Sequence, residues 1–131
     1  MKIGLIGAGR LGICLALLIE QAGYEVLASD NRIDYINSLQ KGIIDTAEPE
    51  VQQYLSDAKN IEFTTDNTRV IAECDLIFTL VATPSLKDGS YDVSAVWKVI
   101  DDFKEISILL NEKSLVIGCT TNPGDCNDFQ E

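Results

Sequence analysis

Residues 2–12 read Lys-Ile-Gly-Leu-Ile-Gly-Ala-Gly-Arg-Leu-Gly, so an apolar stretch runs directly into glycines at positions 7, 9 and 12. The apolar part predicts a buried strand over residues 2–6, and the apolar side chains of residues 11–21 predict a helix packed on a sheet. The pattern G-x-G-x-x-G between a strand and a helix is typical of a turn that binds the pyrophosphate of a dinucleotide. This stretch therefore predicts an α/β fold with a dinucleotide site.

A second strand over residues 25–29 closes on Asp30 and completes the unit. We expect Gly7 to permit the tight turn, Gly9 to let the backbone approach the pyrophosphate, and Gly12 to let the helix pack closely on the strand. Asp30, eighteen residues after Gly12, is expected to accept hydrogen bonds from the adenosine ribose. The alternative is an ordinary turn between a strand and a helix, with Asp30 capping the next helix.

The residues around Asp30 bear on which dinucleotide the turn binds. The carboxylate of Asp30 repels the extra phosphate of NADP, whereas Arg32 either attracts that phosphate or is a solvated residue at a helix end. We give Asp30 more weight and expect NAD. The cofactor-binding residues expected from this part of the chain are Gly7, Ala8, Gly9, Arg10, Leu11, Gly12, Asp30 and Arg32.

Further along the chain, strand and helix patterns alternate. Amphipathic spacing predicts helices over 33–39 and 93–110, a short helix after Pro49, and one or two helical turns over 67–73. Apolar runs predict strands over 61–64, 75–81 and 114–118. Strands separated by helices at these intervals predict a Rossmann-like, doubly wound and mainly parallel sheet with helices on both faces, in a single domain spanning residues 1–131.

Charge and composition exclude several classes of partner. Acidic residues outnumber basic ones 21 to 10, for a formal net charge of −11, and an acidic surface repels nucleic acid and anionic membranes alike. A phosphate-bearing ligand is then expected on backbone N–H groups and a helix dipole rather than on a basic patch. No apolar run reaches the roughly 20 residues that cross a bilayer, and the N-terminus carries no secretory pattern, so we expect a cytoplasmic protein.

Cysteine and histidine usage excludes further chemistry. The four cysteines, Cys14, Cys74, Cys119 and Cys126, form no C-x-x-C pair, so we expect neither a metal site nor a disulfide framework. Apolar surroundings predict Cys14 and Cys74 as small buried side chains. The chain has no histidine, which excludes His-dependent triads and the H-E-x-x-H metal motif.

Several segments together indicate a family by their order and spacing. They are residues 2–12, Ala22-Gly-Tyr-Glu-Val26 leading to Asp30, Leu39-Gln-Lys-Gly42, Glu48-Pro49, Thr64-Thr-Asp66, Cys74-Asp-Leu-Ile-Phe78, Val81-Ala-Thr-Pro84, Asp88-Gly-Ser-Tyr-Asp92 and Thr120-Thr-Asn-Pro-Gly124. In these segments the chain resembles, from Met1 to about Gly124, the N-terminal NAD-binding domain of the UDP-glucose/GDP-mannose dehydrogenase family, the nucleotide-sugar 6-dehydrogenases.

The resemblance implies an oxidoreductase of polysaccharide biosynthesis. Such an enzyme is a large homo-oligomer that oxidises the C6 alcohol of a UDP-glucose-type nucleotide sugar to a carboxylate with two NAD. Thr83, in the family's V-x-T-P segment with Val81, would be a catalytic residue that lies near the nicotinamide and orders a water or a substrate group. The alternative is a hydroxyl that satisfies the turn before Pro84. Thr120 or Thr121 would line the cofactor cleft in place of the family's S-T-V-P segment.

The resemblance also implies that residues 1–131 lack part of the enzyme. The family's later glutamates, lysine, asparagine and nucleophilic cysteine would lie beyond residue 131, and neither Cys119 nor Cys126 matches the nucleophile. Residues 48–51 lack the glycine of the family's E-P-G-L segment, and residues 119–126 lack a second proline and a lysine. We therefore expect cofactor binding without turnover by this chain alone. Because a sixth strand is missing, we also expect self-association through an exposed sheet edge.

Two other functions are compatible with the sequence. One is the cofactor domain of another NAD(P)-dependent dehydrogenase, acting for example on hydroxy acids or on 6-phosphogluconate. The segments 88–90 and 120–124 argue against it. The other is a non-catalytic module in which a bound dinucleotide controls contacts with a partner.

Overall fold

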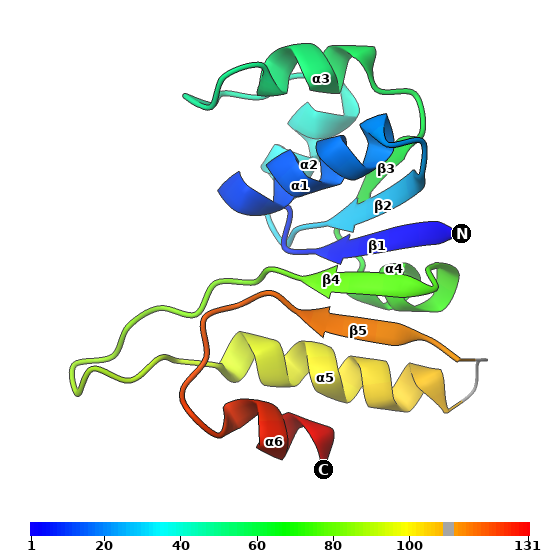
Figure 1. The fold of residues 1–131 in the computed structure, drawn as a ribbon. Coiled ribbons are helices and arrows are strands. Elements are labelled where there is room, and N and C mark those ends of the chain that lie inside the picture. The colour runs from blue at the N-terminus through cyan, green and yellow to red at the C-terminus, as the bar shows by residue number, and fades with distance from the viewer. Residues whose placement is uncertain (109–111) are drawn as a thin grey trace.

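The computed structural model describes residues 1–108 and 112–131, which fold around one five-stranded sheet (Figure 1). The strands are β1 (Lys2–Ile6), β2 (Glu25–Ser29), β3 (Ile61–Thr64), β4 (Leu76–Thr79) and β5 (Ser114–Ile117). They pair in the order β3-β2-β1-β4-β5, and every neighbouring pair is parallel. The predicted doubly wound α/β fold is confirmed, and the named strands are wholly rather than mainly parallel.

Helices cover both faces of the sheet, as predicted. They are α1 (Arg10–Gln21), α2 (Ile33–Gln40), α3 (Val51–Asp57), α4 (Asn67–Glu73), α5 (Ser94–Ser107) and α6 (Asp125–Gln130). The first three helices pack against the sheet face that buries Leu5 and Val26, and α4 and α5 pack against the face that buries Leu27 and Ile77. Alternate residues of each strand therefore enter opposite cores, as in a parallel sheet that is covered on both sides.

Three details differ from the sequence-based predictions. The strand predicted over 75–81 ends at Thr79, because its neighbour β1 ends at Ile6 and the last bond between them runs from the Leu80 N–H to the Ile6 carbonyl. The helix predicted over 93–110 is α5, and residues 109–110 of that prediction lie outside the described residues. Helix α6 was not predicted, because Phe129 is its one buried side chain and six residues show no helical period.

The strand order places a switch point between β1 and β4. The chain winds from β1 outward to β2 and β3 and then returns to the other side of β1 as β4 and β5. The connections therefore leave the carboxyl ends of β1 and β4 in opposite directions and open a crevice there. In doubly wound sheets, ligands bind in the crevice at this point.

Two kinds of feature are absent from the described residues. None of the helices in ranges 1–108 and 112–131 is both long enough and apolar enough to span a bilayer. In the same ranges, no three side chains of the metal-binding types gather at one place.

Candidate dinucleotide-binding site

The glycine turn joins β1 to α1 at the switch point. Gly7 has φ +99°, in the left-handed region, and a Cβ there would lie 2.6 Å from the carbonyl carbon and oxygen of Leu80. A Cβ on Gly12 would come closer to the carbonyl oxygen of Gly7 than Cβ atoms come to backbone in proteins. The N–H groups of Gly7 and Ala8 both donate to the Ser29 carbonyl, at 2.9 and 2.8 Å, and so fasten the turn to β2. Close packing thus requires glycine at positions 7 and 12.

The N-terminus of α1 presents backbone donors at this turn. Its N-cap residue is Gly9, which has no side chain to accept hydrogen bonds from the first helical turn. The helical hydrogen bonds begin with the Ile13 N–H, which donates to the Gly9 carbonyl at 2.9 Å. The N–H groups of Arg10, Leu11 and Gly12 therefore have no helical partner. With the positive end of the helix dipole, these N–H groups are suited to bind an anion.

The end of β2 carries the predicted ribose-binding acid. The side chain of Asp30 is 8% exposed, and Arg32 donates to both of its oxygens, from Nε to Oδ1 at 2.8 Å and from Nη2 to Oδ2 at 3.0 Å. The guanidinium of Arg32 lies over the ring of Tyr35, 4.2 Å from its centroid, and the Tyr35 hydroxyl donates to the Ala8 carbonyl at 2.8 Å. The hydrogen bond with Asp30 raises the pKa of Arg32, which stays charged. These contacts tie Asp30 and Arg32 to the glycine turn.

These groups meet in a cleft of about 560 Å³ at the carboxyl ends of β1, β2 and β4. Its volume lies within the range of small-molecule sites, about 300–1,000 Å³. The predicted cofactor-binding residues that line it are Gly7, Gly9, Arg10, Asp30, Arg32 and Val81. The other polar residues of the lining, which were not predicted, are Asn31, Asn67 and Lys98.

The cleft is positively charged, although the protein is strongly acidic. Its ionisable lining residues are three cations, Arg10, Arg32 and Lys98, and one carboxylate, Asp30. Arg10 shares its charge with Glu48, since its Nη2 lies 2.6 Å from Oε1 of that residue. Residues distant in sequence thus bring three of the ten basic side chains to the lining, whereas the expectation that backbone N–H groups hold a phosphate ligand stays a prediction.

Other predicted residues lie around the cleft rather than in its lining. Ala8 is buried beneath the turn, and Gly12 packs against Gly7. Leu11 is 68% exposed and does not line the cleft. Thr83, Thr120 and Thr121 also lie outside the lining, on two loops that leave the carboxyl edge of the sheet.

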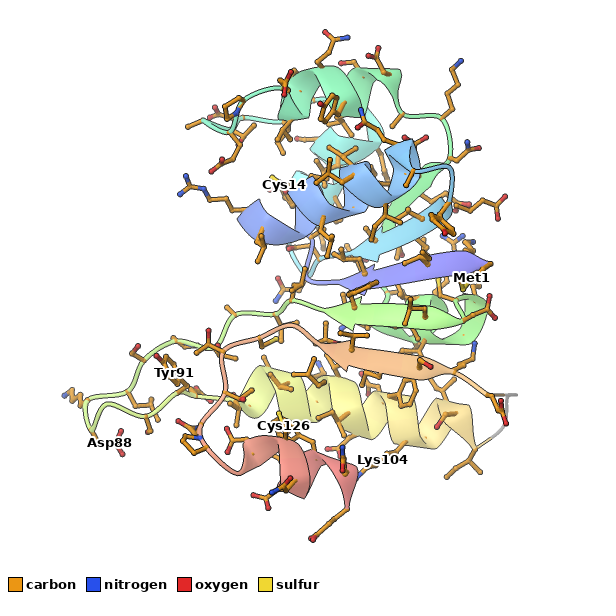
Figure 2. The ribbon with its side chains drawn as sticks, viewed as in Figure 1. Met1, Cys14, Asp88, Tyr91, Lys104 and Cys126 are labelled. Atoms are coloured by element: carbon orange, nitrogen blue, oxygen red, sulfur yellow. The ribbon has the colours of Figure 1, made fainter. Side chains whose placement is uncertain are left out.

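The loop that carries Thr83 projects beyond the sheet, with Asp88 and Tyr91 in its outer part (Figure 2). Asn122 holds this loop through the backbone of Tyr91. The Tyr91 N–H donates to Oδ1 of Asn122 at 2.8 Å, and Nδ2 of Asn122 donates to the Tyr91 carbonyl at 3.0 Å. The structure thus joins the Thr83 loop to the segment 120–124. Sequence reasoning missed this role of Asn122, although the residue stands inside a predicted segment.

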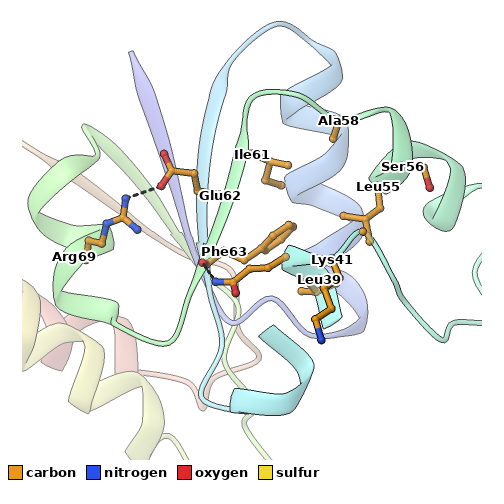
Figure 3. Close-up of a pocket in the computed structure, with 11 residues that line it drawn as sticks. Leu39, Lys41, Leu55, Ser56, Ala58, Ile61, Glu62, Phe63 and Arg69 are labelled. Carbon is orange, nitrogen blue, oxygen red and sulfur yellow. Dashed lines mark hydrogen bonds and ion pairs between the residues drawn. The ribbon is translucent and has the colours of Figure 1, made fainter. Parts of the chain in front are cut away.

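A larger cleft, of about 680 Å³, lies elsewhere, at the outer edge of β3 (Figure 3). Its polar groups already bind one another. Arg69 Nη2 lies 2.6 Å from Glu62 Oε2, and Gln40 Nε2 donates to the Phe63 carbonyl at 2.9 Å. The lining of this larger cleft includes neither the glycine turn nor Asp30. We therefore assign the site to the smaller cleft, because size alone does not supply groups for a ligand.

The cysteines stand apart from the cleft lining. Cys74 is buried, and burial raises its pKa to about 11. Burial also raises the pKa of Cys119, whose thiol donates to the Thr79 carbonyl at 3.3 Å. Cys14 on α1 is only partly buried, and Cys126 is exposed on α6, far from Cys14 (Figure 2). The predicted burial of Cys74 is confirmed, and that of Cys14 is confirmed in part.

Comparisons with known proteins show the family to which this chain belongs. The model of the UDP-glucose/GDP-mannose dehydrogenase family, NAD binding domain, matches residues 1–131. The UDP-glucose 6-dehydrogenase of Rickettsia bellii (strain RML369-C) is 30% identical over 133 residues, which cover 98% of this chain and 30% of that protein. The GDP-mannose 6-dehydrogenase of Pseudomonas aeruginosa is 29% identical over 135 residues, with coverage of 98% and 30%. The chain therefore spans less than a third of these curated relatives.

Solved structures of nucleotide-sugar dehydrogenases have a similar fold. The crystal structure of a ternary complex of GDP-mannose dehydrogenase from Pseudomonas aeruginosa superposes with a TM-score of 0.92 at 26% identity, covering 98% of this chain and 30% of that one. A UDP-glucose dehydrogenase from Pyrobaculum islandicum has the same fold, with a TM-score of 0.87 at 23% identity and coverage of 94% and 29%. With the family match extending over its whole length, this chain belongs to the UDP-glucose/GDP-mannose dehydrogenase family and corresponds to its NAD-binding domain.

Proposed function

We propose that the cleft binds NAD and that this chain supplies the cofactor-binding part of a nucleotide-sugar 6-dehydrogenase. The observation that carries the proposal is the packing of the turn. Gly7 and Gly12 leave no room for a Cβ, so the uncapped N-terminus of α1 stands at the carboxyl edge of the sheet beside Asp30. A dinucleotide suits this arrangement, because its pyrophosphate needs N–H donors and its ribose needs a nearby acceptor.

The adenosine end of the cleft is built from the first βαβ unit. We assign the pyrophosphate to the N–H groups of Arg10, Leu11 and Gly12, where Gly9 allows the close approach of a ligand. We assign the ribose to Asp30. Ala8 and Arg32 support this end, Ala8 through its hydrogen bond with Tyr35 and Arg32 through its pair with Asp30.

The other end of the cleft is assigned to the nicotinamide. Val81 lines it directly, and the loops with Thr83 and with Thr120 and Thr121 extend from the same edge. Thr83 is proposed as the catalytic residue that orders a water or a substrate group beside the reacting carbon. The chain's own share in catalysis is to bind and orient the two reactants.

NAD supplies the acceptor for the hydride that leaves the alcohol carbon. Oxidation onward to a carboxylate also needs a nucleophile, and the Cys119 thiol is a poor one, because burial raises its pKa. We therefore propose that residues 1–131 bind the cofactor without completing the reaction. The nucleophile would belong to the part of the family's length that this chain does not span.

The names of the relatives support a nucleotide sugar as substrate, oxidised at its C6 alcohol. We propose a substrate of the UDP-glucose type, in a homo-oligomeric enzyme of polysaccharide biosynthesis that works in the cytoplasm. The net charge of −11 supports the absence of nucleic acid and membrane partners, because acidic surfaces repel both.

Calorimetry with the purified chain tests cofactor binding. NAD and NADH are each expected to bind with a Kd below about 1 mM, and Gly9→Ala is expected to abolish the heat of binding because its methyl group enters the cleft. Circular dichroism checks that the variant is folded. No detectable binding of either nucleotide to the folded wild type would overturn the proposal. Assays of the full-length protein with UDP-glucose and GDP-mannose then identify the sugar nucleotide.

A further inference from the structure

The pair of Asp30 and Arg32 limits how strongly the acid can select NAD. A carboxylate has about four lone-pair sites for hydrogen bonds. Arg32 occupies three of these sites on Asp30, because its backbone N–H donates at 3.0 Å, its Nε at 2.8 Å and its Nη2 at 3.0 Å. One site therefore remains for the two hydroxyls of an adenosine ribose. The negative charge that would repel a ribose 2′-phosphate is also compensated by the guanidinium.

Arg32 keeps donors that the pair does not use. A guanidinium has about five N–H donors, and two of those on Arg32 go to Asp30, so three remain. The side chain is 57% exposed and lines the cleft. Its Nη2 lies 4.0 Å from the place where a Cβ on Gly9 would stand, so the free donors are beside the phosphate-binding turn.

A second cation, Lys98, enters the same cleft from α5. Lys98 pairs with no carboxylate among the residues that the structure describes. Arg10 is paired with Glu48 and Arg32 with Asp30, so the three cations and these two acids sum to a formal charge of +1 in a protein of net charge −11. Lys98 is therefore the cation of the lining whose charge no described carboxylate balances.

We propose, on the basis of the dinucleotide function proposed above, that the adenosine end accepts a ribose 2′-phosphate, so that this chain binds NADP as well as NAD. Arg32 donates to the 2′-phosphate with its remaining N–H groups while it stays paired with Asp30. The planar fork of an arginine suits both contacts at once. Lys98 adds attraction for the extra negative charge.

Calorimetric titration of the purified chain with NAD and with NADP tests this inference. The wild type is expected to bind both, with Kd values within about tenfold of each other. Arg32→Ala is expected to raise the Kd for NADP about tenfold or more relative to the Kd for NAD, because the charge-assisted hydrogen bonds that it removes go only to the 2′-phosphate. Lys98→Ala is expected to weaken the binding of NADP more than the binding of NAD, and this difference is expected to be larger at low salt.

Lys104→Ala is the matched control, because Lys104 lies on the same helix near its C-terminal end and outside the cleft lining (Figure 2). It is expected to change neither Kd. Binding of NADP more than about tenfold weaker than that of NAD would overturn this inference and leave the proposed function standing. Equal weakening of both nucleotides by Arg32→Ala would also overturn it. Failure of the folded wild type to bind either nucleotide would overturn the proposed function itself.

Discussion

Replacing Gly12 with alanine tests whether the packing of the glycine turn holds both the fold and the site. The added Cβ would clash with the Gly7 carbonyl oxygen and would lie 3.1 Å from Leu5 Cδ2. The carbonyl belongs to a turn whose N–H groups are bound to Ser29, so it has little freedom to move away. Overpacking a tight site costs about 1–3 kcal/mol, and we take the upper value because the obstacle is backbone.

A helical alanine in place of glycine recovers about 1 kcal/mol of this cost. Gly12→Ala should therefore lower the free energy of unfolding by about 2 kcal/mol, and the Tm by roughly 8 °C for a domain of this size. The shift of α1 should also weaken the binding of NAD, raising its Kd about tenfold for one lost hydrogen bond to phosphate. Urea denaturation followed by circular dichroism measures the first effect, and calorimetry measures the second.

Gly9→Ala is the matched comparison for this experiment. Gly9 has φ −70°, and a Cβ there would meet only Arg32 Nη2, at 4.0 Å. Its loss of stability should stay within about 1 kcal/mol, the usual range for an N-cap position, while binding is lost. A Gly12→Ala protein as stable as the wild type within about 0.5 kcal/mol would refute the packing argument. Normal NAD binding by Gly9→Ala would refute the assignment of the pyrophosphate to this turn.

Three other predictions follow from contacts outside the turn. Asn122→Ala removes two hydrogen bonds to the Tyr91 backbone, so amide exchange at Tyr91 should accelerate while exchange in β1 stays unchanged. Hydrogen bonds from two basic partners lower the pKa of Glu73 from 4.5 to about 2, so its contribution to stability is present above pH 4.5 and disappears as the pH falls toward 2. The free energy of unfolding, measured with urea, should therefore fall less between pH 6 and pH 3 in Glu73→Gln than in the wild type. Equal falls in the two proteins would contradict the role of this acid. Strand β5 lies at an outer edge of the sheet and carries Val116, which is 38% exposed, so the predicted self-association through a sheet edge should involve this strand. Val116→Lys should then reduce the association in a sedimentation experiment, and a purely monomeric wild type at high concentration would contradict the prediction.

The first βαβ unit was predictable because its constraints are local. Within the unit, Gly7 has a positive φ and a Cβ on Gly12 would meet the Gly7 carbonyl, so the spacing of the glycines already carries this geometry. The close approach of Leu80 and Val81 to Gly7 comes from outside the unit. The end of β4 was not predictable, since Leu80 and Val81 are as apolar as the strand before them and the strand stops only where its partner β1 stops. Helix α6 forms where Phe129 meets the ring of Trp97, with centroids 4.8 Å apart, and no local pattern signals that contact.

The site was predictable to the extent that its chemistry resides in the backbone. A turn that brings N–H groups to a phosphate needs glycine, and Asp30 follows at the end of the next strand, so both leave a signal in the sequence. Lys98 leaves none, because an exposed lysine on an amphipathic helix looks the same whether it faces a cleft or solvent. Its position depends on the packing of α4 and α5 against the sheet, which brings residue 98 near residue 30.

The two ends of the cleft differ in how they are held, and this difference separates their roles. The adenosine end is continuous with β1 and β2, and hydrogen bonds from Gly7, Ala8 and Tyr35 connect its parts. The proposed nicotinamide end adjoins the Thr83 loop, which projects beyond the sheet and which Asn122 holds from a neighbouring segment through the Tyr91 backbone. Disturbance of the first end should therefore change affinity for the whole dinucleotide. Disturbance of Asn122 should instead leave that affinity nearly constant and alter how Thr83 meets a substrate, which in the full-length protein would lower kcat more than it raises KM for the cofactor.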